Sequence, residues 1–392
     1  MSESPAMELH RKLNGKIVVS GKMKATSMND LALLYTPGVA DACNAIKANS
    51  SEVYNLTMKK NSVAIVTDGT RVLGLGNIGA LASLPVMEGK AFLFNAFAGI
   101  DAFPIPLFTQ DKNEIISIVK NIAPVFGGIN LEDIESPKCF EIERALQDIG
   151  IPVFHDDQHG TAIVCLAGLI NALKVVKKDF SEIKIIVNGA GAAGIAIAKL
   201  ILSYRDEKGK AVKELISFDS KGPISKNRKD LDEFKKELAL LSNKNNFSGT
   251  LEKAMKNADV FIGVSKPNTV SKEMVKSMAR DSILFVLSNP IPEIWPKDAF
   301  DAGAKIVSTA RADTPNQVNN SSAFPGIFRG ALDAGATKIN AEMKLAAAVA
   351  LASCIEKPTA QKILPSPFEK HVVPAIAKAV AEAAKKSGVV RK

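Results

Sequence analysis

Four acidic residues lie at the ends of two neighbouring apolar segments. Glu132 and Asp133 close the run APVFGGINLED, and Asp156 and Asp157 follow the run IPVF, which we expect to be a strand. An amphipathic helix is expected between the two runs. The carboxyl ends of parallel strands meet at one edge of a sheet, so this strand–helix–strand unit should bring the four carboxylates side by side.

Three or four carboxylates cannot crowd together as free anions without a cation. A set of oxygen ligands selects a hard ion, Mg²⁺ or Mn²⁺, over zinc. His155 and His159 lie nearby and would suit zinc, but no third soft ligand accompanies them. The remaining alternative is that these acids are helix caps or surface residues.

Two segments match the pattern G-x-G-x-x-G, and their contexts differ. The segment GAGAAG follows the expected strand IKIIVN and opens the apolar helix IAIAKLILSY. Glycines there would let the backbone approach a dinucleotide pyrophosphate at the helix N-terminus, and an acid ending the next strand would accept hydrogen bonds from ribose. The expected cofactor-binding residues are Gly189, Gly191, Ala192, Ala193, Gly194, Asp219 and Ser220.

The other match, Gly74, Gly76 and Gly79 in GLGNIG, is followed by Pro85. Proline would interrupt a long helix. We therefore interpret GLGNIG as a tight structural turn near the substrate and not as the cofactor site.

The choice between NAD and NADP stays open at this stage. Asp219 favours a free ribose 2′-hydroxyl, but Lys221, Lys226 and Arg228 follow closely and could neutralise a 2′-phosphate. These three cations could equally be a solvated loop.

The order of elements predicts an α/β protein with two domains. Residues 1–160 form an N-terminal α/β domain that holds substrate and metal residues. Residues 161–392 form a Rossmann-like, doubly wound parallel-sheet domain for the dinucleotide, with C-terminal helices. The runs DVFIGVS, SILFVLSNP and AKIVSTA continue its strands, and a long helix should begin at Thr161. The helix in SPKCFEIERALQDIG should have Ser136 as cap and Pro137 at its first position.

Composition excludes several classes of protein. The chain has 392 residues, 46% of them hydrophobic and 23% charged, as in globular proteins. The 50 Lys and Arg against 41 Asp and Glu are scattered without a nucleic-acid-binding module. No apolar run reaches the roughly 18 residues of a membrane helix. The N-terminus lacks a signal core, and the four cysteines form no CxxC pair, so we expect a cytoplasmic protein with reduced thiols.

Several motifs together resemble one enzyme family, the malic enzymes. They occur in order as YTPGV, TDGTRVLGLGNIG, PVMEGKA, LEDI, FHDDQHGTA, GAGAAG, LSNPIPE and NNSSAFPG, and the resemblance covers nearly the whole chain. It points to the short form of the family, without a fused phosphotransacetylase-like domain. It implies oxidative decarboxylation of malate to pyruvate with NAD or NADP, a divalent metal, and a homodimer.

The resemblance also implies roles for individual residues. Glu132, Asp133 and Asp157 match metal ligands. Lys90, in MEGKA, matches the catalytic lysine, and Asp156 matches an acid that orients it. A nearby dication, Arg71 and partial burial should lower the pKa of Lys90, so that a neutral amine takes the substrate hydroxyl proton.

The remaining matches concern substrate and cofactor. Tyr35, in YTPGV, matches the proton donor to the enol, and Arg71 is suited to holding a substrate carboxylate. Asn289, Asn319 and Asn320 match residues that contact substrate or cofactor.

Two rival functions remain. A metal-free two-domain dehydrogenase of the amino-acid dehydrogenase type would keep full activity in excess chelator. A non-catalytic dinucleotide sensor would use Gly189 to Asp219 but would give no role to Lys90, Asp156 and Asp157, and it would not reduce nicotinamide with malate.

Overall fold

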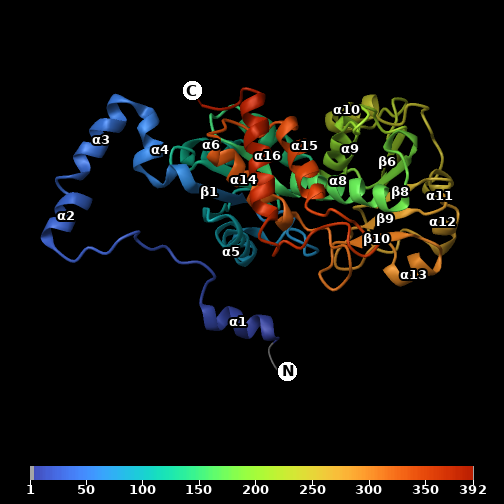
Figure 1. Cartoon of the computed structure of the whole chain (residues 1–392), viewed down its shortest axis with the longest axis horizontal. Helices are drawn as coiled ribbons and strands as arrows, with labels where there is room; N and C mark the ends of the chain where they lie inside the picture. Colours follow the sequence, from blue (N-terminus) through green and yellow to red (C-terminus); the bar gives the residue numbers. More distant parts are fainter. Residues whose placement is uncertain (1–3, 392) are drawn as a thin grey trace.

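The computed structural model describes residues 4–391, and it contains two parallel sheets side by side with helices on their faces (Figure 1). The α/β, two-sheet, Rossmann-like fold class predicted from the sequence is confirmed. Short Val/Ile-rich strands that are buried on both faces explain this architecture.

The first sheet has four parallel strands in the order β2-β1-β3-β4. Helices follow its strands, as expected for parallel connections. The strands are β1 (Ser62–Thr67), β2 (Asp101–Pro106), β3 (Gly128–Leu131) and β4 (Val153–His155), and the helices are α5 (Gly79–Ala98), α6 (Lys112–Ile122) and α7 (Lys138–Leu146).

The second sheet has six strands in the order β10-β9-β8-β5-β6-β7, and only β7 is antiparallel. Its strands are β5 (Lys184–Asn188), β6 (Glu214–Asp219), β7 (Gly222–Pro223), β8 (Val260–Gly263), β9 (Ile283–Val286) and β10 (Ile306–Thr309). Its helices are α9 (Ala192–Ser203), α10 (Glu233–Leu241), α11 (Leu251–Met255), α12 (Lys272–Lys276) and α13 (Pro296–Asp301). After β5 the chain adds β6 and β7 on one side, and it then adds β8, β9 and β10 on the other side. The crevice between β5 and β8 is therefore a topological switch point, where such folds bind ligands.

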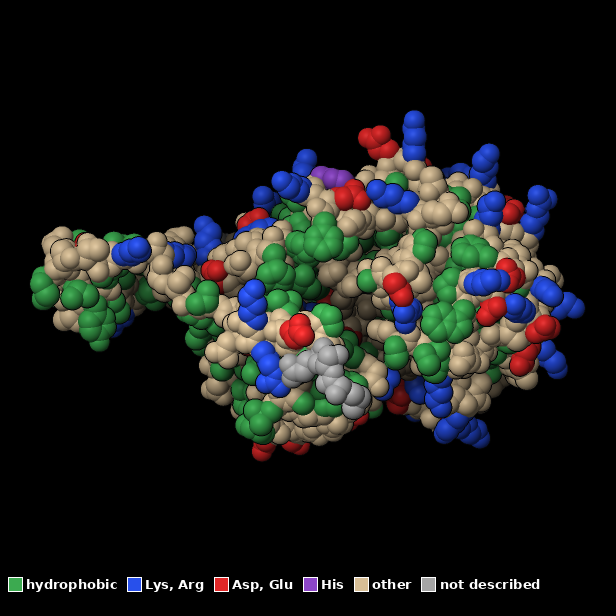
Figure 2. Space-filling view, turned by 90° about the horizontal axis from the view of Figure 1, so that it is seen from below, with side chains coloured by type: hydrophobic (Ala, Val, Ile, Leu, Met, Phe, Trp, Pro, Cys, Tyr) green, Lys and Arg blue, Asp and Glu red, His purple; other side chains and the backbone are tan. Residues whose placement is uncertain are grey.

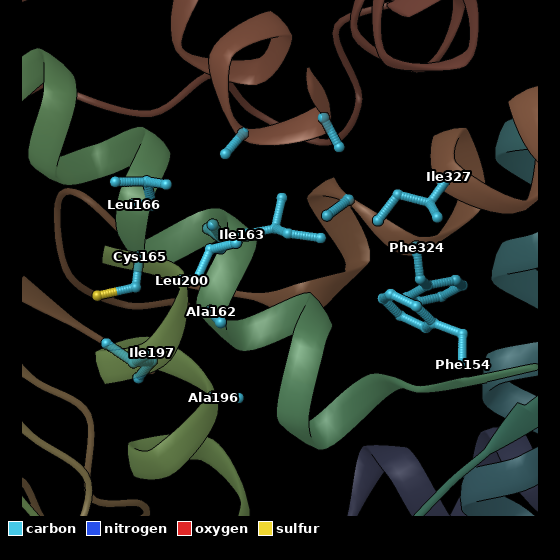
Figure 3. Close-up of a cluster of buried hydrophobic side chains, with 14 of the residues drawn as sticks. Phe154, Ala162, Ile163, Cys165, Leu166, Ala196, Ile197, Leu200, Phe324 and Ile327 are labelled. Atoms are coloured by element: carbon cyan, nitrogen blue, oxygen red, sulfur yellow. The ribbon is translucent and has the colours of Figure 1, made fainter. Parts of the chain in front are cut away.

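Helix α8 (Asp156–Val176) connects the two sheets and forms the centre of the core. It packs against α9, against α15 (Ala341–Ser353) and against the short helix η4 (Asn320–Ser322), which precedes α14 (Phe324–Asp333). Buried side chains of α8, α9 and α14 belong to one hydrophobic cluster (Figure 3). Helix α16 (Val372–Lys386) packs on α14, and Phe324 and Phe328 of α14 contact Phe94 of α5. The C-terminal helices therefore return to the first sheet. Between residues 4 and 391, α8 is the one helix long and apolar enough to cross a membrane, and two thirds of its apolar window is buried in the fold.

The N-terminal segment forms an arm that extends away from the two sheets (Figure 1). We define the arm as residues 17–57, which include α2 (Met28–Leu34), α3 (Val39–Ala48), η1 (Ser50–Glu52) and α4 (Val53–Leu56). Helix α1 (Pro5–Leu13) precedes it, and η2 (Met58–Asn61) leads into β1. No residue of α2 or α3 is buried.

Three local expectations are wrong. Pro85 lies inside α5, which continues through it. The proline has no N–H to donate to the carbonyl of Leu81, one turn earlier, and Leu81 is an exposed residue. Ser136 does not cap α7: Pro137 is the N-cap residue and makes no side-chain cap bond. Helix α8 begins at Asp156, five residues before Thr161, so the acids of HDD form its first turn.

Candidate active site

The structure brings three carboxylates together at the carboxyl edge of the first sheet. Glu132 and Asp133 follow β3, and Asp157 lies in the first turn of α8, directly after β4. One oxygen of each lies within 4.8 Å of the others. This spacing suits a single hard cation coordinated by one oxygen of each carboxylate.

Neighbouring groups fix the three carboxylates. Asn130 donates from Nδ2 to Oε2 of Glu132 at 2.9 Å, and the backbone N–H of Asp133 donates to Oδ2 of Asp157 at 2.8 Å. Asp133 has a left-handed φ of 54° and its carbonyl accepts the N–H of Arg71 at 2.9 Å. The chain therefore turns sharply after β3 and holds Asp133 against its neighbours.

The cluster is electrostatically unsatisfied without a cation. Burial and the charge of Asp157 raise the pKa of Asp133 to about 8, and burial also raises the pKa of Glu132. Oδ2 of Asp133 is buried and has no hydrogen-bond partner among the described residues. A divalent cation would supply the missing partner and favour the charged carboxylates, so the donor set fits Mg²⁺ or Mn²⁺.

Lys90 projects from α5 into this cluster and is only 7% exposed. Its Nζ lies 2.5 Å from Oε1 of Glu132, forms an ion pair with Asp156, and lies 4.6 Å from the centre of the Phe324 ring. Burial lowers the pKa of Lys90, but the charges of Asp156 and Glu132 outweigh burial and raise the pKa above its ordinary value. The expected lowering of this pKa included a bound dication, and without one the neighbouring acids raise the pKa instead.

A pocket of about 380 Å³ opens beside Lys90. Its lining includes Asn320, Phe324 and Lys16, so Asn320 shares a cavity with Lys90. A Cβ placed on Gly160 would lie 1.9 Å from Oδ1 of Asp156 and 3.0 Å from Cβ of Asn320. Only glycine at this position leaves room for the carboxylate that holds Lys90.

The two remaining residues of the expected substrate site differ in position. Arg71 lies in the loop after β1, next to Asp133, and its guanidinium has no ion pair or hydrogen bond within the described chain. Tyr35, by contrast, ends α2 on the arm and is 72% exposed. Within one chain, α2, which Tyr35 ends, lies on the arm and away from α5, which carries Lys90 (Figure 1).

The loop GAGAAG lies at the switch point of the second sheet. Gly189 has φ of 125°, and a Cβ there would lie 2.7 Å from the carbonyl oxygen of Val264. A Cβ on Gly194 would lie 1.8 Å from the carbonyl oxygen of Gly189. Helix α9 begins at Ala192, so Ala192 and Ala193 present its free N–H groups, as a pyrophosphate site requires.

Asp219 ends β6 beside the exposed Ser220, but its carboxylate is already engaged. It accepts from Arg228 at 2.7 and 3.2 Å, from Lys235 at 3.1 Å and from the N–H of Lys221 at 3.0 Å. These donors occupy most of the acceptor sites of one carboxylate.

The two other asparagines lie in turns. Asn289 precedes Pro290, and a Cβ on Gly74 would lie 3.1 Å from the carbonyl oxygen of Asn289. Asn319 accepts the N–H of Ser321 at 2.9 Å and begins η4 (Asn320–Ser322). The turn of GLGNIG therefore packs against the SNP loop.

Sequence reasoning missed the residues that support the site. Glu143 of α7 is buried, accepts the N–H of His155 at 3.1 Å, and pairs with Nε2 of His159 at 2.9 Å. The spacing of Gly160, one helical turn after Asp156, could have indicated a crowded helix face. Nothing in the local pattern marks Glu143 or Asn130.

Two family models match this chain. Residues 14–114 and 106–147 match the malic enzyme N-terminal domain, and residues 158–385 match the malic enzyme NAD-binding domain. The bifunctional malic/malolactic enzyme of Bacillus subtilis is 53% identical over 98% of this chain and 94% of its own length. The NAD-dependent malic enzyme of Geobacillus stearothermophilus is 51% identical over 97% of this chain and 79% of its own length.

A solved structure shows the same fold. The NAD-dependent malic enzyme of Thermotoga maritima is 47% identical, covers 97% of this chain and 99% of its own, and has a TM-score of 0.92. Together with the two family models, these similarities show that the chain belongs to the malic enzyme family of NAD- or NADP-dependent oxidoreductases.

Proposed function

We propose that this protein oxidises and decarboxylates (S)-malate to pyruvate and CO₂ while reducing NAD, and that it requires Mg²⁺ or Mn²⁺. The observation that carries the proposal is Lys90, held by Asp156 and Glu132 beside three converging carboxylates. The malic enzymes of Geobacillus and Thermotoga, which are named NAD-dependent, support the same activity.

The metal would be held by Glu132, Asp133 and Asp157. When bound, the cation would supply Lewis-acid stabilisation of the charge left by CO₂, and the nicotinamide would supply the hydride acceptor. The cation would also offset the carboxylate charges that raise the pKa of Lys90, which brings the amine closer to the neutral form needed for proton abstraction.

The chain's own residues would then position malate and move its protons. Lys90 takes the proton from the C2 hydroxyl, and Asp156 orients Nζ for that transfer. Arg71 is free to hold a carboxylate of the substrate. Asn320 lines the pocket beside Lys90, and Asn289 would also contact the substrate or cofactor. The same residues should also decarboxylate added oxaloacetate.

Tyr35 would protonate the enol of pyruvate, and we propose that a second copy of the chain supplies it. The arm carries large hydrophobic side chains with no cover in one chain, including Met28, Leu33 and Val39. Figure 2 shows such side chains gathered on the protruding end of the arm. A homodimer would bury them and bring the partner's Tyr35 to Lys90.

Subunit complementation tests this arrangement. Lys90→Ala and Tyr35→Phe are each expected to lose pyruvate formation. In a mixed dimer, the site that combines Lys90 from one chain with Tyr35 from the other is intact, so random mixing should restore about a quarter of wild-type activity. If Tyr35 acted within its own chain, no mixture would recover activity.

We further propose a preference for NAD over NADP. Asp219, Asp230 and Asp232 together match the charge of Lys221, Arg228 and Lys235, and ion pairs join the six residues into one network. No net positive charge remains in this network for a 2′-phosphate. Initial rates with malate and Mn²⁺ should be higher with NAD than with NADP; a higher rate with NADP would refute the preference.

Excess chelator distinguishes the proposal from a metal-free dehydrogenase. We expect EDTA to abolish malate-dependent reduction of NAD and Mn²⁺ to restore it. We also propose a domain boundary near residue 160 and a cytoplasmic location, with which four free thiols are consistent.

A further inference from the structure

A second pocket, of about 510 Å³, lies away from the residues assigned to catalysis, metal and dinucleotide. Helices α7, α9, α10 and the start of α15 surround it, and α8 forms one wall. Its apolar lining includes Phe140, Ile195, Leu200 and Phe234. Neither the GAGAAG loop nor Asp219 nor the three clustered acids line this pocket, which we call the α7–α9 pocket.

Two polar side chains in this pocket lack partners. Gln158 is 4% exposed, and its Nε2 makes no hydrogen bond to any described residue. Lys344 has no ion pair within 4 Å in residues 4–391, and burial lowers its pKa although the charge of Glu143 opposes this. Both groups are donors, so the pocket offers one cation and one amide to an incoming acceptor.

The other charged side chains that line the pocket have hydrogen-bonding or ion-pair partners among the described residues. Arg144 pairs with Glu233 at 3.3 Å and with Glu237 at 3.1 Å, and Lys199 pairs with Glu237 at 2.6 Å. Glu143 is occupied by His159 and by the N–H of His155. A carboxylate group of a ligand could accept from both remaining donors, Nζ of Lys344 and Nε2 of Gln158. The aromatic and aliphatic walls favour an apolar body for such a ligand.

This pocket is linked to the catalytic edge through one carboxylate. Glu143 holds His159 with one oxygen and, with the other, the backbone of His155, the residue before Asp156. Gln158 follows Asp157 directly on α8. A ligand bound against Gln158 and His159 therefore contacts the same helical turn that positions the carboxylates of Asp156 and Asp157.

We propose that the α7–α9 pocket is an effector site for a small monocarboxylate with an apolar body, and that its occupancy changes the affinity of the acidic cluster for its divalent ion. The occupant would place its carboxylate between Lys344 and Gln158 and its hydrocarbon part against Phe140 and Phe234. The link to metal affinity rests on the proposed metal site, whereas binding in the pocket does not.

Calorimetry with hexanoate tests binding in the pocket. Hexan-1-ol, which has the same six-carbon chain but no charge, is the comparison ligand. The full-length protein is titrated in the presence of NAD and Mn²⁺. We expect hexanoate to bind at least tenfold more tightly than hexan-1-ol. Lys344→Met should weaken hexanoate at least fivefold, and Ala341→Trp, at the pocket edge, should block it. Lys338→Met, a surface lysine paired with Asp148 at 2.9 Å, is the matched control and should bind as wild type.

Titration of Mn²⁺ with and without hexanoate tests the link. The apparent Kd for Mn²⁺ should change at least threefold in the wild type and not in Lys344→Met, while malate turnover without hexanoate stays within twofold in both. Equal binding of the two probes, unchanged binding in Lys344→Met, or competition between hexanoate and malate would overturn the site. Binding in the pocket with an unchanged Kd for Mn²⁺ would overturn the effector role alone, and failure of Mn²⁺ to bind at all would instead count against the proposed function.

Discussion

The two edges of the first sheet each bury a lysine that is 7% exposed, but the surroundings of the two lysines are opposite. At the amino edge, Nζ of Lys59 donates to the carbonyls of Ala123 and Phe126, each at 2.7 Å. Burial, reinforced by Arg391, lowers the pKa of Lys59 to about 8. At the carboxyl edge, Lys90 faces Asp156 and Glu132, and its pKa is raised despite burial.

The difference separates a structural lysine, Lys59, from Lys90, which we propose to be reactive. Carbonyl partners fix a loop and offer Lys59 no proton acceptor and no metal. Carboxylate partners hold the charge of Lys90 at the place where a cation would compete for the same oxygens. Burial alone therefore does not identify a catalytic lysine, but burial among acids at the carboxyl edge of a parallel sheet does point to function.

The largest effect is expected from Lys90→Arg. Arginine keeps the ion pairs with Asp156 and Glu132 but does not give up its proton, so malate turnover should fall by about 10² to 10⁴. Steady-state kinetics measures kcat, and circular dichroism checks that the variant is folded. Turnover near the wild-type value would show that Lys90 is no more reactive than Lys59.

Lys59→Met is expected to lower the stability of the protein and to leave its malate turnover nearly unchanged. It leaves two buried carbonyls without their donor, at a cost of about 1–3 kcal/mol in the free energy of unfolding. Turnover at 25 °C should stay within twofold. Urea unfolding measures the loss, and a catalytic defect without a stability defect would contradict the structural role.

A smaller effect concerns pH. Without metal, Asp133 keeps its proton up to pH about 8, whereas the unfolded chain releases it near its ordinary pKa of 3.8. The folded state then binds more protons than the unfolded state, so the metal-free protein should lose stability as pH rises through this window. Mn²⁺ needs the charged form, so the rise in Tm that it produces should be larger at pH 8.5 than at pH 6.5. A rise in Tm that does not depend on pH would exclude a titrating ligand. Asp111→Asn, at the exposed N-cap of α6, is a control that should not alter this dependence.

Much of the fold could be predicted because the spacing of apolar residues and the positions of turn-forming residues are local features of the sequence. The buried runs SVAIVT and ILFV became β1 and β9, and GAGAAG joined β5 to α9 as expected. Pro85 misled because a helix tolerates proline where the freed carbonyl can reach solvent.

The site also has parts that local sequence patterns predict and parts that they do not. The convergence of Glu132, Asp133 and Asp157 followed from strand order alone. The contacts of Lys90 required the distant α5 to cross the sheet edge, and only the family resemblance pointed to them. The engagement of Asp219 by Arg228 and Lys235 depends on side-chain rotamers that no pattern specifies. The environment that we propose for Tyr35 requires a second copy of the chain, which no pattern in the sequence places.

Electron paramagnetic resonance of Mn²⁺ titrated into the protein tests the acidic cluster most directly. We predict one tightly bound Mn²⁺ per chain, with affinity reduced about 100-fold or more in Asp157→Asn and retained in Lys59→Met. Binding of Mn²⁺ to Asp157→Asn with wild-type affinity would contradict a shared cation at this edge, and with it the proposed route from malate to pyruvate.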